Sequence, residues 1–554
     1  MKSLKIVVSL FVLIFLSVTA FSQQKKQDQI SIKDISGAEA IIGLQFSKAQ
    51  QDSMQQDLED NLESYQTLRK IPLENSIPPA LIFNPVPLDF EIPDEQFPIH
   101  WGVTDTFPLP QMMEELAFYP IKDLAELIRT GKITSTELTK MYLERLKKYG
   151  PQLECVITLT EDLALKQAAQ ADEEIAAGRY RGLLHGIPYG AKDLLAVKGY
   201  KTTWGAMPYK DQYIDENATV IQKLEEAGAV LVAKLSMGAL AWGDVWYGGK
   251  TKNPWDLKQG SSGSSAGSAA ATAAGLVAFS IGTETWGSIV SPSTRCGDTG
   301  LRPTYGRVSR AGAMALSWSM DKIGPICRTV EDCAIVFNVI RGSDRIDQSV
   351  IDAPFNFTTD VDLKKLKIGY LKTDFEQDTL NKQNNEATLA KLTEMGVNLI
   401  PIELPDIPVN SLAFILSAEA ASAFDELTRS GRDSLMVRQV RDAWPNVFRA
   451  SRFIPAVEYI QANRVRYILI QKMYELMQQV DLYLAPSFSD DLLLTNLTGN
   501  PCVVLPNGFN KDGTPTSISF IGKLFDEATI LSVAKRYQDA TGFQLKHPPL
   551  FHQF

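Results

Sequence analysis

The feature that most constrains the fold is an alternation of helix-like and strand-like segments that begins near Ile121. Apolar residues recur with helical spacing over 124–150 and 162–178. Residues 218–235 have the pattern of a helix, a glycine-containing turn and a buried strand, and the same order returns over 386–404. Alternation of this kind predicts an α/β fold whose helices pack over a mostly parallel sheet.

The first 22 residues have the pattern of an export signal. Lys2 and Lys5 precede an apolar run of 15 residues, and small residues stand at positions 20 and 22. This pattern is typical of a signal peptide that is cleaved after Ser22. The run is shorter than the roughly 20 residues of a membrane-spanning helix, so we expect cleavage and no stable membrane insertion afterwards. The expected location is the periplasm or the medium outside the cell.

A second segment separates this signal from the helix–strand alternation. Residues 23–115 contain a stretch with helical spacing and then a proline-rich run, "IPLENSIPPALIFNPVPLDFEIPDEQFPIHW". The proline-rich run favours an extended arm that lies over a surface. We therefore expect an N-terminal extension over 23–115 and one large domain over 116–554.

Charge and composition exclude several classes of protein. The net charge is −10 and basic residues form no long run, so a nucleic-acid partner is not expected. The histidines lack metal-ligand spacing, and we expect no metal. The scattered cysteines form neither a disulfide framework nor a C-x-x-C pattern, which favours buried free thiols and leaves a Cys327–Cys333 bridge open. These cysteines are Cys155, Cys296, Cys327, Cys333 and Cys502.

The segment "GSSGSSAGSAAATAAG", residues 260–275, resembles a flexible linker at first sight. It leads, however, into small helix-competent residues and then into the apolar stretch "LVAFSIGTETWGSIVSP", so it is part of the fold and not a tether. It also matches G-x-S-x-G, with Ser265 in the nucleophile position. That motif requires a buried strand directly before it, and the preceding "TKNPWDLKQGSS" is polar and broken by Pro254.

Four ordered segments carry a resemblance to a known family. "LHGIPYGAKDLLAVKG", "GSSAGSAAATAAG", "GTETWGSIVSP" and "CGDTGLRPTYGRVSRAG" resemble the amidase signature family, and the resemblance extends over about 121–542. It implies the amidase signature fold, with a large mixed, mostly parallel sheet covered by helices on both faces. It also implies hydrolysis of amides through an acyl-enzyme, without a metal or organic cofactor.

The resemblance places a Ser–Ser–Lys triad on Lys192, Ser264 and Ser288, with a cis peptide bond before Ser264. Ser288 is the nucleophile and Ser264 the bridging serine. Burial among apolar residues would lower the pKa of Lys192 and make it a base. A hydroxyl both donates and accepts, so Ser264 can relay a proton from Ser288 to the lysine.

Further residues are expected around the substrate carbonyl. Backbone N–H groups of Thr285, Trp286, Gly287 and Ser288 would form the oxyanion hole. Ser265, the second serine of the Ser–Ser pair, completes the predicted binding set.

The sequence departs from the family pattern around the nucleophile. Trp286 stands where glycine is usual, and tryptophan would fit badly if that position needs a positive φ; its ring could also enter the acyl pocket. Glu284 replaces the usual Asp and Val290 the usual Arg. We therefore hypothesise an ion pair between Glu284 and Arg295 that braces this turn.

Together these features predict an exported amide hydrolase acting on a small-molecule amide. Export argues against a tRNA amidotransferase, because charged tRNA and ATP are absent outside the cytoplasm. An esterase or broad acyl hydrolase with the same triad stays open, as does a catalytically weak ligand-binding homologue. The sequence does not fix the oligomeric state, and a homodimer stays open.

Overall fold

The computed structural model describes residues 30–101 and 109–552, which fall into two compact units. The smaller unit extends to Glu74 and includes Phe453–Pro455. Its helices are α2 (Ile32–Ile42) and α3 (Lys48–Leu68), and serine N-caps begin both of them. The predicted signal peptide, residues 1–22, lies outside the described residues.

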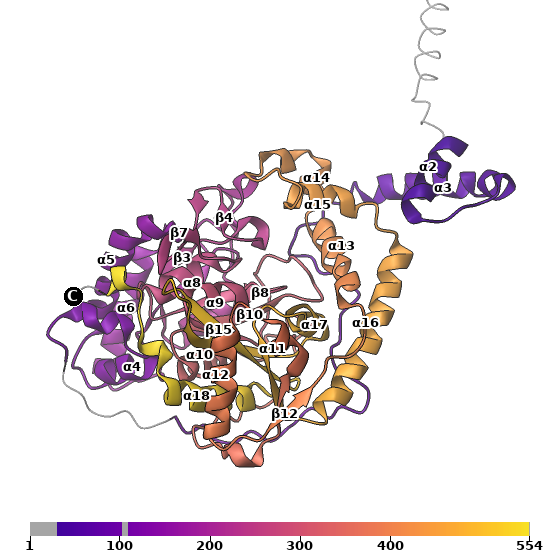
Figure 1. Cartoon of the computed structure of the whole chain (residues 1–554). Coiled ribbons are helices and arrows are strands. Elements are labelled where there is room, and N and C mark those ends of the chain that lie inside the picture. Colours follow the sequence, from indigo (N-terminus) through magenta and orange to yellow (C-terminus); the bar gives the residue numbers. More distant parts are fainter. Residues whose placement is uncertain (1–29, 102–108, 553–554) are drawn as a thin grey trace, which may run out of the picture. The chain divides into compact units, whose positions relative to one another are not determined.

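The larger unit, residues 75–452 and 456–554, is built on one sheet of 11 strands (Figure 1). The strand order is β1-β3-β2-β8-β10-β9-β14-β15-β13-β11-β12. The strands are β1 (Val156–Leu159), β2 (Pro188–Lys192), β3 (Val230–Leu235), β8 (Phe279–Glu284), β9 (Thr299–Arg302), β10 (Lys322–Cys327), β11 (Ile368–Leu371), β12 (Leu399–Ile402), β13 (Leu482–Pro486), β14 (Cys502–Phe509) and β15 (Pro515–Gly522). Two small sheets pair β4 (Val245–Trp246) with β5 (Gly249–Lys250) and β6 (Lys252–Asn253) with β7 (Asp256–Gly260).

The sheet is large and mixed, as expected, but the expectation that it is mostly parallel was wrong. Parallel pairing joins β2 to β3 and β8, and β11 to β12 and β13. The remaining neighbours are antiparallel, including β8–β10, β9–β14 and β14–β15. Antiparallel strands need only a short connection, such as the turn between Phe509 and Pro515, whereas parallel neighbours need a crossover. The helix–strand alternation therefore describes the two flanks of the sheet better than its centre.

Helices surround this sheet (Figure 1). They are α4 (Ile121–Arg129), α5 (Ser135–Leu153), α6 (Glu161–Ala176), α7 (Thr219–Glu226), α8 (Ala266–Ala273), α9 (Val290–Cys296), α10 (Val330–Ile340), α11 (Lys372–Gln377), α12 (Lys382–Glu394), α13 (Phe414–Ala423), α14 (Asp425–Arg429), α15 (Trp444–Ser451), α16 (Ala456–Met477), α17 (Asp491–Thr498) and α18 (Glu527–Thr541). Helix α8 is buried along its whole length and packs on α5, α9 and β8. Its small side chains permit this close approach, and it anchors the Gly/Ser segment in the core.

The prediction that the Gly/Ser segment belongs to the core is therefore confirmed, and the nucleophile-elbow alternative fails. The strand before the segment, β7, pairs with β6 in a separate two-stranded sheet, so the segment does not follow a strand of the main sheet. All five cysteines are buried free thiols, and Cys327 and Cys333 are not bonded to each other. Over the described ranges, no helix combines the length and apolarity needed to cross a membrane.

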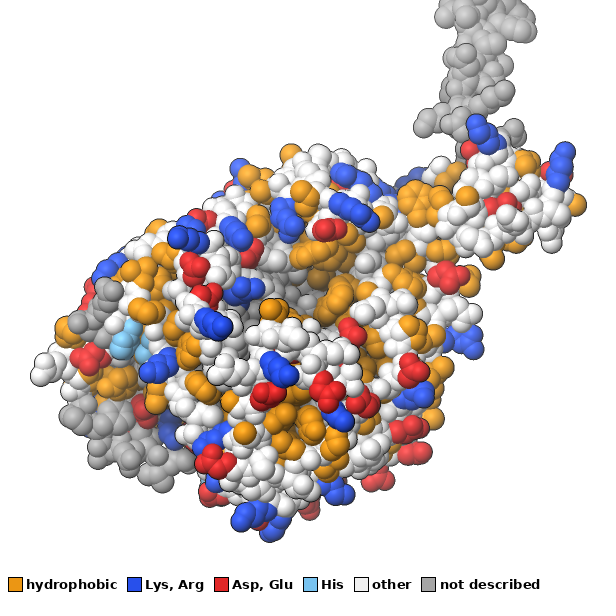
Figure 2. Space-filling view, in the orientation of Figure 1, with side chains coloured by type: hydrophobic (Ala, Val, Ile, Leu, Met, Phe, Trp, Pro, Cys, Tyr) orange, Lys and Arg blue, Asp and Glu red, His pale blue; other side chains and the backbone are white. Residues whose placement is uncertain are grey.

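The proline-rich arm lies on the larger unit from Asn75 onward. Val86, Phe90 and Ile92 pack against a cluster formed by Ala353, Leu524 and Phe525. Gln96 donates its amide to the carbonyl of Phe355 at 2.9 Å. In the face shown in Figure 2, charged side chains of both signs are interspersed with exposed apolar ones.

Candidate active site

Lys192 ends strand β2 and is fully buried. Its Nζ lies 2.8 Å from Ser264 Oγ, 3.0 Å from Ser265 Oγ and 2.8 Å from Thr283 Oγ1. Burial lowers the pKa of Lys192 from 10.5 to about 7, although the carboxylates of Asp321 and Glu284 act in the opposite direction. A lysine with this pKa is neutral in about half of the molecules at pH 7 and can then accept a proton.

Ser264 and Ser265 lie in the loop that begins α8. The peptide bond before Ser264 is cis, as the resemblance implies. The Ser265 hydroxyl donates to the carbonyl of Thr283 at 3.0 Å and accepts from the N–H of the same residue at 3.1 Å. Ser265 is fully buried, and these contacts link the loop to β8.

Strand β8 leads into a turn of residues 285–288, the Ser288 turn, before α9 begins. The carbonyl of Ser288 accepts from the N–H of Ser265 at 3.1 Å, which brings the turn against the Ser-rich loop. Among the described residues, no hydrogen bond joins the Ser264 and Ser288 hydroxyls directly. Ser264 therefore contacts Lys192 directly, and the adjacent Ser265 joins the same loop to the backbone of Ser288.

The concern that Trp286 occupies a strained position does not hold. Gly287, and not Trp286, has the positive φ, at 82°, so the glycine is kept where the backbone requires it. The indole of Trp286 is 42% exposed, which places it at the surface. Thr285 turns its hydroxyl away from the turn and donates to Asp321 Oδ1 at 2.6 Å.

The Glu284 carboxylate binds the backbone directly after the Ser288 turn. Its Oε2 accepts from the backbone N–H groups of Ile289 and Val290 at 2.8 and 2.9 Å. Its Oε1 accepts from Arg302 at 3.0 Å and from Asn496 at 2.8 Å. Burial opposes ionisation, but Arg302 and these hydrogen bonds outweigh it and lower the pKa of Glu284 to about 2.

The hypothesis of a Glu284–Arg295 pair was therefore wrong. Arg295 donates to Gln259 at 3.0 Å on the surface, because α9 turns that side of the helix outward. The partner of Glu284 is Arg302, fully buried at the end of β9. The sequence signal for it was "GLRPTYG", whose arginine is the last residue of β9.

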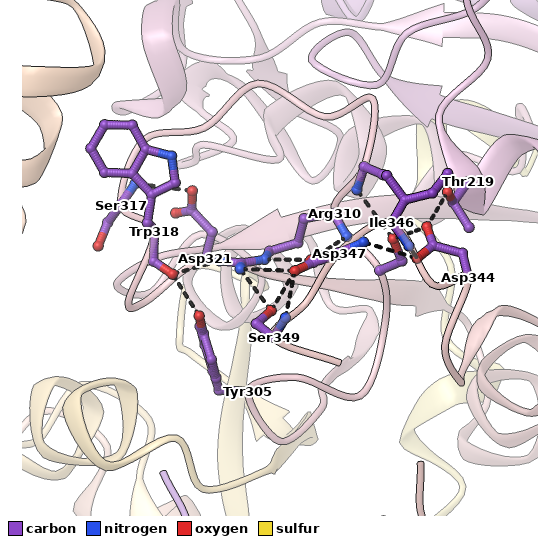
Figure 3. Close-up of polar contacts among 12 residues, drawn as sticks. Thr219, Tyr305, Arg310, Ser317, Trp318, Asp321, Asp344, Ile346, Asp347 and Ser349 are labelled. Atoms are coloured by element: carbon purple, nitrogen blue, oxygen red, sulfur yellow. Dashed lines mark hydrogen bonds and ion pairs between the residues drawn. The ribbon is translucent and has the colours of Figure 1, made fainter. Parts of the chain in front are cut away.

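Other polar groups near the site were missed by sequence reasoning. Thr283 contacts Lys192, and Asp321 contacts Thr285. Arg310 and Asp347 form an ion pair at 3.0 Å, and both line a cavity that Thr283 and Thr285 also line (Figure 3). The late histidines are not near this site: His547 stacks on Phe118 with ring centroids 4.2 Å apart, and burial lowers its pKa to about 3.

Comparisons with known proteins agree on the family. The family model "Amidase" matches residues 137–492. The A subunit of the glutamyl-tRNA(Gln) amidotransferase of Acinetobacter baumannii is 34% identical over 488 residues, covering 78% of this chain and 98% of that protein. Its counterpart in Coxiella burnetii is 32% identical over 479 residues, covering 78% and 99%.

Solved structures show the same fold. The native peptide amidase of Stenotrophomonas maltophilia superposes with a TM-score of 0.70 at 28% identity, covering 79% of this chain and 100% of that one. An amidase family protein of Bacillus anthracis gives 0.70 at 27% identity, covering 79% and 93%. The match over most of the chain, together with the fold, shows that this protein belongs to the amidase family, within the amidase signature group, and is a hydrolase of carbon–nitrogen bonds in amides.

Proposed function

We propose that the protein is an exported amide hydrolase that works through a Ser288 acyl-enzyme with Ser264 and Lys192 as its proton relay. The observation that carries this proposal is the 2.8 Å contact between Lys192 Nζ and Ser264 Oγ in a site where the lysine pKa is about 7. A buried lysine of this kind can hold a proton during one step and return it in the next.

The reaction follows from these positions. Ser288 Oγ attacks the amide carbonyl while its proton passes to Ser264, whose own proton passes to the neutral Lys192 nitrogen. Backbone N–H groups of the Ser288 turn stabilise the oxyanion. The C–N bond then breaks as the leaving amine takes a proton back through Ser264. Water attacks the acyl-enzyme by the same relay, and the carboxylate leaves.

Export rests on residues 1–22, whose charge and apolar pattern favour a cleaved signal. A mature N-terminus at Gln23, found by sequencing the protein from a periplasmic or culture-medium fraction, is the expected result. Recovery of the full-length chain in the cytoplasm would contradict export without affecting the catalytic proposal.

The decisive experiment is labelling with a serine-directed fluorophosphonate followed by peptide mass spectrometry. We expect label on Ser288, and its loss in Lys192→Ala. Ser262→Ala is a matched control, because this serine lies in the same loop and contacts Ser291, not the lysine. Label on Ser265, or none on the folded protein, would contradict the proposal; the second result favours a ligand-binding homologue. Relative rates on matched amides and esters separate an amidase from an esterase.

A second candidate follows from the relatives, whose name describes one component of a tRNA amidotransferase. If this chain had that role, it would act as part of an assembly. Hydrolysis of a simple amide by the purified chain alone, with one ammonia or amine released per carboxylate, supports the hydrolase. Amide turnover only when the other amidotransferase components are added would support the second candidate.

A further inference from the structure

A cavity of about 650 Å³ adjoins the Ser288 turn at Thr283 and Thr285. One part of its lining is the loop from Arg310 to Ile323, and another is the proline-rich segment 75–82, which we call the strap. The strap precedes the region that the family model matches, 137–492. The contacts of the strap show how it is held against the cavity.

Both ends of the strap are fixed to residues that themselves line the cavity. The Asn75 carboxamide accepts from the N–H of Ala315 at 2.7 Å and donates to the carbonyl of the same residue at 2.8 Å. Directly after the other end, the ring of Phe83 contacts that of Tyr305, with centroids 5.0 Å apart. Arg466 also lies over the Phe83 ring, 3.6 Å from its centroid. The strap is therefore held in a fixed position beside the Ser288 turn.

The middle of the strap is apolar and stiff. Pro78 and Pro79 have a fixed φ and no N–H to satisfy, so the segment can cross open space without unpaired donors there. Leu81 is 84% exposed and Ile82 50% exposed, although both line the cavity. Apolar side chains that face an open cavity gain stability when an apolar ligand covers them.

The ionic groups of the cavity are already satisfied by the protein (Figure 3). Arg310 binds Asp347 at 3.0 Å and donates to the carbonyl of Trp318 and the hydroxyl of Ser349, each at 2.8 Å. Asp347 in turn also accepts from the N–H and the hydroxyl of Ser349. Neither charge is left to meet a charged ligand.

The ionic side chains nearer the Ser288 turn are also hydrogen-bonded within the protein. The Asp321 carboxylate accepts from Thr285 and from the N–H groups of Leu316 and Ser317. Lys322 is buried and donates to the carbonyl of Met320. The remaining ionic side chain of the lining, Glu216, is exposed to solvent.

We propose that this cavity binds a neutral, largely apolar portion of the amide substrate, and that the strap limits the size of that portion. The proposal rests on the proposed function, because it takes the Ser288 turn as the place of reaction. The volume falls in the range of about 300–1,000 Å³ that is usual for small-molecule sites. A carboxylate placed here would lose its water without gaining a partner, and an ammonium would find only the solvent-exposed Glu216, so charged ligands are disfavoured.

The first test measures binding without catalysis. The probe is N-phenyl-1-naphthylamine, and its charged match is 8-anilinonaphthalene-1-sulfonate, which adds only a sulfonate. In Ser288→Ala full-length protein, we expect the neutral probe to bind at least about 10-fold more tightly than the sulfonate. Ala80→Trp, which fills the strap side of the cavity, should weaken neutral-probe binding by about 10-fold or more. Equal binding of the two probes would overturn the inference.

Matched variants separate the cavity from other apolar surface. Leu88→Trp adds the same side chain to the arm at a residue that is 64% exposed and does not line the cavity, and it should leave probe binding unchanged. Ile346→Trp, at another part of the lining, should act as Ala80→Trp does, and it serves if Ala80→Trp is poorly folded by circular dichroism. Weakening by Leu88→Trp to the same degree would overturn the inference.

The second test links the cavity to turnover. In the otherwise wild-type chain, Ala80→Trp should lower the ratio of kcat/KM for a phenylalkyl amide to kcat/KM for acetamide by about 10-fold or more. A ratio unchanged in a folded variant would refute the role of the strap. Probe binding without a Ser288 acyl-enzyme would refute the proposed function alone, whereas a Ser288 acyl-enzyme without selective probe binding would refute the cavity inference alone.

Discussion

Replacing Lys192 with methionine should abolish activity and at the same time stabilise the protein. Lys192 is fully buried, and its pKa is about 7 in the folded chain against 10.5 for an ordinary lysine. Below pH 7 the unfolded chain holds this proton at no cost, while the folded chain holds it in an unfavourable place. Each pKa unit corresponds to about 1.4 kcal/mol, so the site costs about 4 kcal/mol of stability at pH 7.

Lys192→Met removes this cost, but it also removes the hydrogen bonds that the lysine makes, which offsets part of the stabilisation. Lys192 contacts the hydroxyls of Ser264, Ser265 and Thr283, and each hydrogen bond contributes about 1 kcal/mol. The net stabilisation of Lys192→Met at pH 7 is then about 1 kcal/mol. The hydrogen-bond offset does not depend on pH, so the pH dependence is the sharper measurement.

The sign of that dependence follows from the two pKa values. Between pH 7 and 10.5 the unfolded chain binds the proton and the folded chain does not, so wild-type stability rises with pH in this window. Above pH 10.5 the lysine is neutral in both states, and burying it no longer lowers the stability through this proton. From about pH 7 to about pH 9 the wild type should therefore gain about 2 kcal/mol relative to Lys192→Met.

Urea unfolding of both proteins at about pH 7, 8 and 9, followed by tryptophan fluorescence, measures this difference. Lys166→Met, at an exposed position of α6, is the control and should run parallel to the wild type. A constant difference between wild type and Lys192→Met across these pH values would refute the argument that the folded chain holds Lys192 as a neutral base.

Three further predictions follow from the site. Because the relay needs neutral Lys192, kcat/KM should rise about 10-fold per pH unit below pH 7 and level off above it, and a profile that is flat from about pH 5 to about pH 9 would contradict this. Arg302→Met should destabilise the protein by about 3 kcal/mol or more, because it leaves the buried Glu284 carboxylate unpaired. Adding Glu284→Gln should recover part of this loss, measured by thermal unfolding, and additive losses in the double variant would contradict the pairing. Gly287→Ala should destabilise the protein by about 1 kcal/mol, because alanine is strained at the φ of +82° in the Ser288 turn, and should lower kcat by about 10-fold or more in the folded protein. Unchanged kcat would contradict the need for this backbone conformation.

The sequence predicted the flanks of the sheet better than it predicted the centre of the sheet or the surroundings of the candidate site. Lys192, Ser264 and Ser288 each stand in a distinctive local segment, so an ordered set of short patterns was enough to propose them as a triad. The antiparallel centre of the sheet had no such signal, because strand direction depends on which distant strands become neighbours. Strands β9 and β14, for example, pair although about 200 residues of chain separate them.

The partner of Glu284 shows the same limit at the level of one side chain. Arg295 is 11 positions away and Arg302 is 18 positions away, and nothing in their spacing distinguishes them. The distinction arises because α9 ends at Cys296 and the chain then returns into the core as β9. Arg302 thereby reaches Glu284 at the end of β8, while Arg295 stays on the outer side of a short helix. An isolated buried carboxylate would be unstable, so the fold selects the arginine that is buried with it.

Burial acts on both ionisable groups of the proposed site. It lowers the pKa of Lys192 to about 7, yet Glu284 stays ionised because Arg302 and two backbone N–H groups bind its oxygens. The two groups must be separated for this to work, since a carboxylate in direct contact with Lys192 would raise the lysine pKa again. The hydroxyls of Ser264 and Thr283 fill the immediate surroundings of Lys192 instead. Thr283→Asp should therefore restore an ordinary lysine pKa and abolish activity at neutral pH, and a pH–rate profile that keeps its wild-type midpoint in this variant would contradict the reasoning.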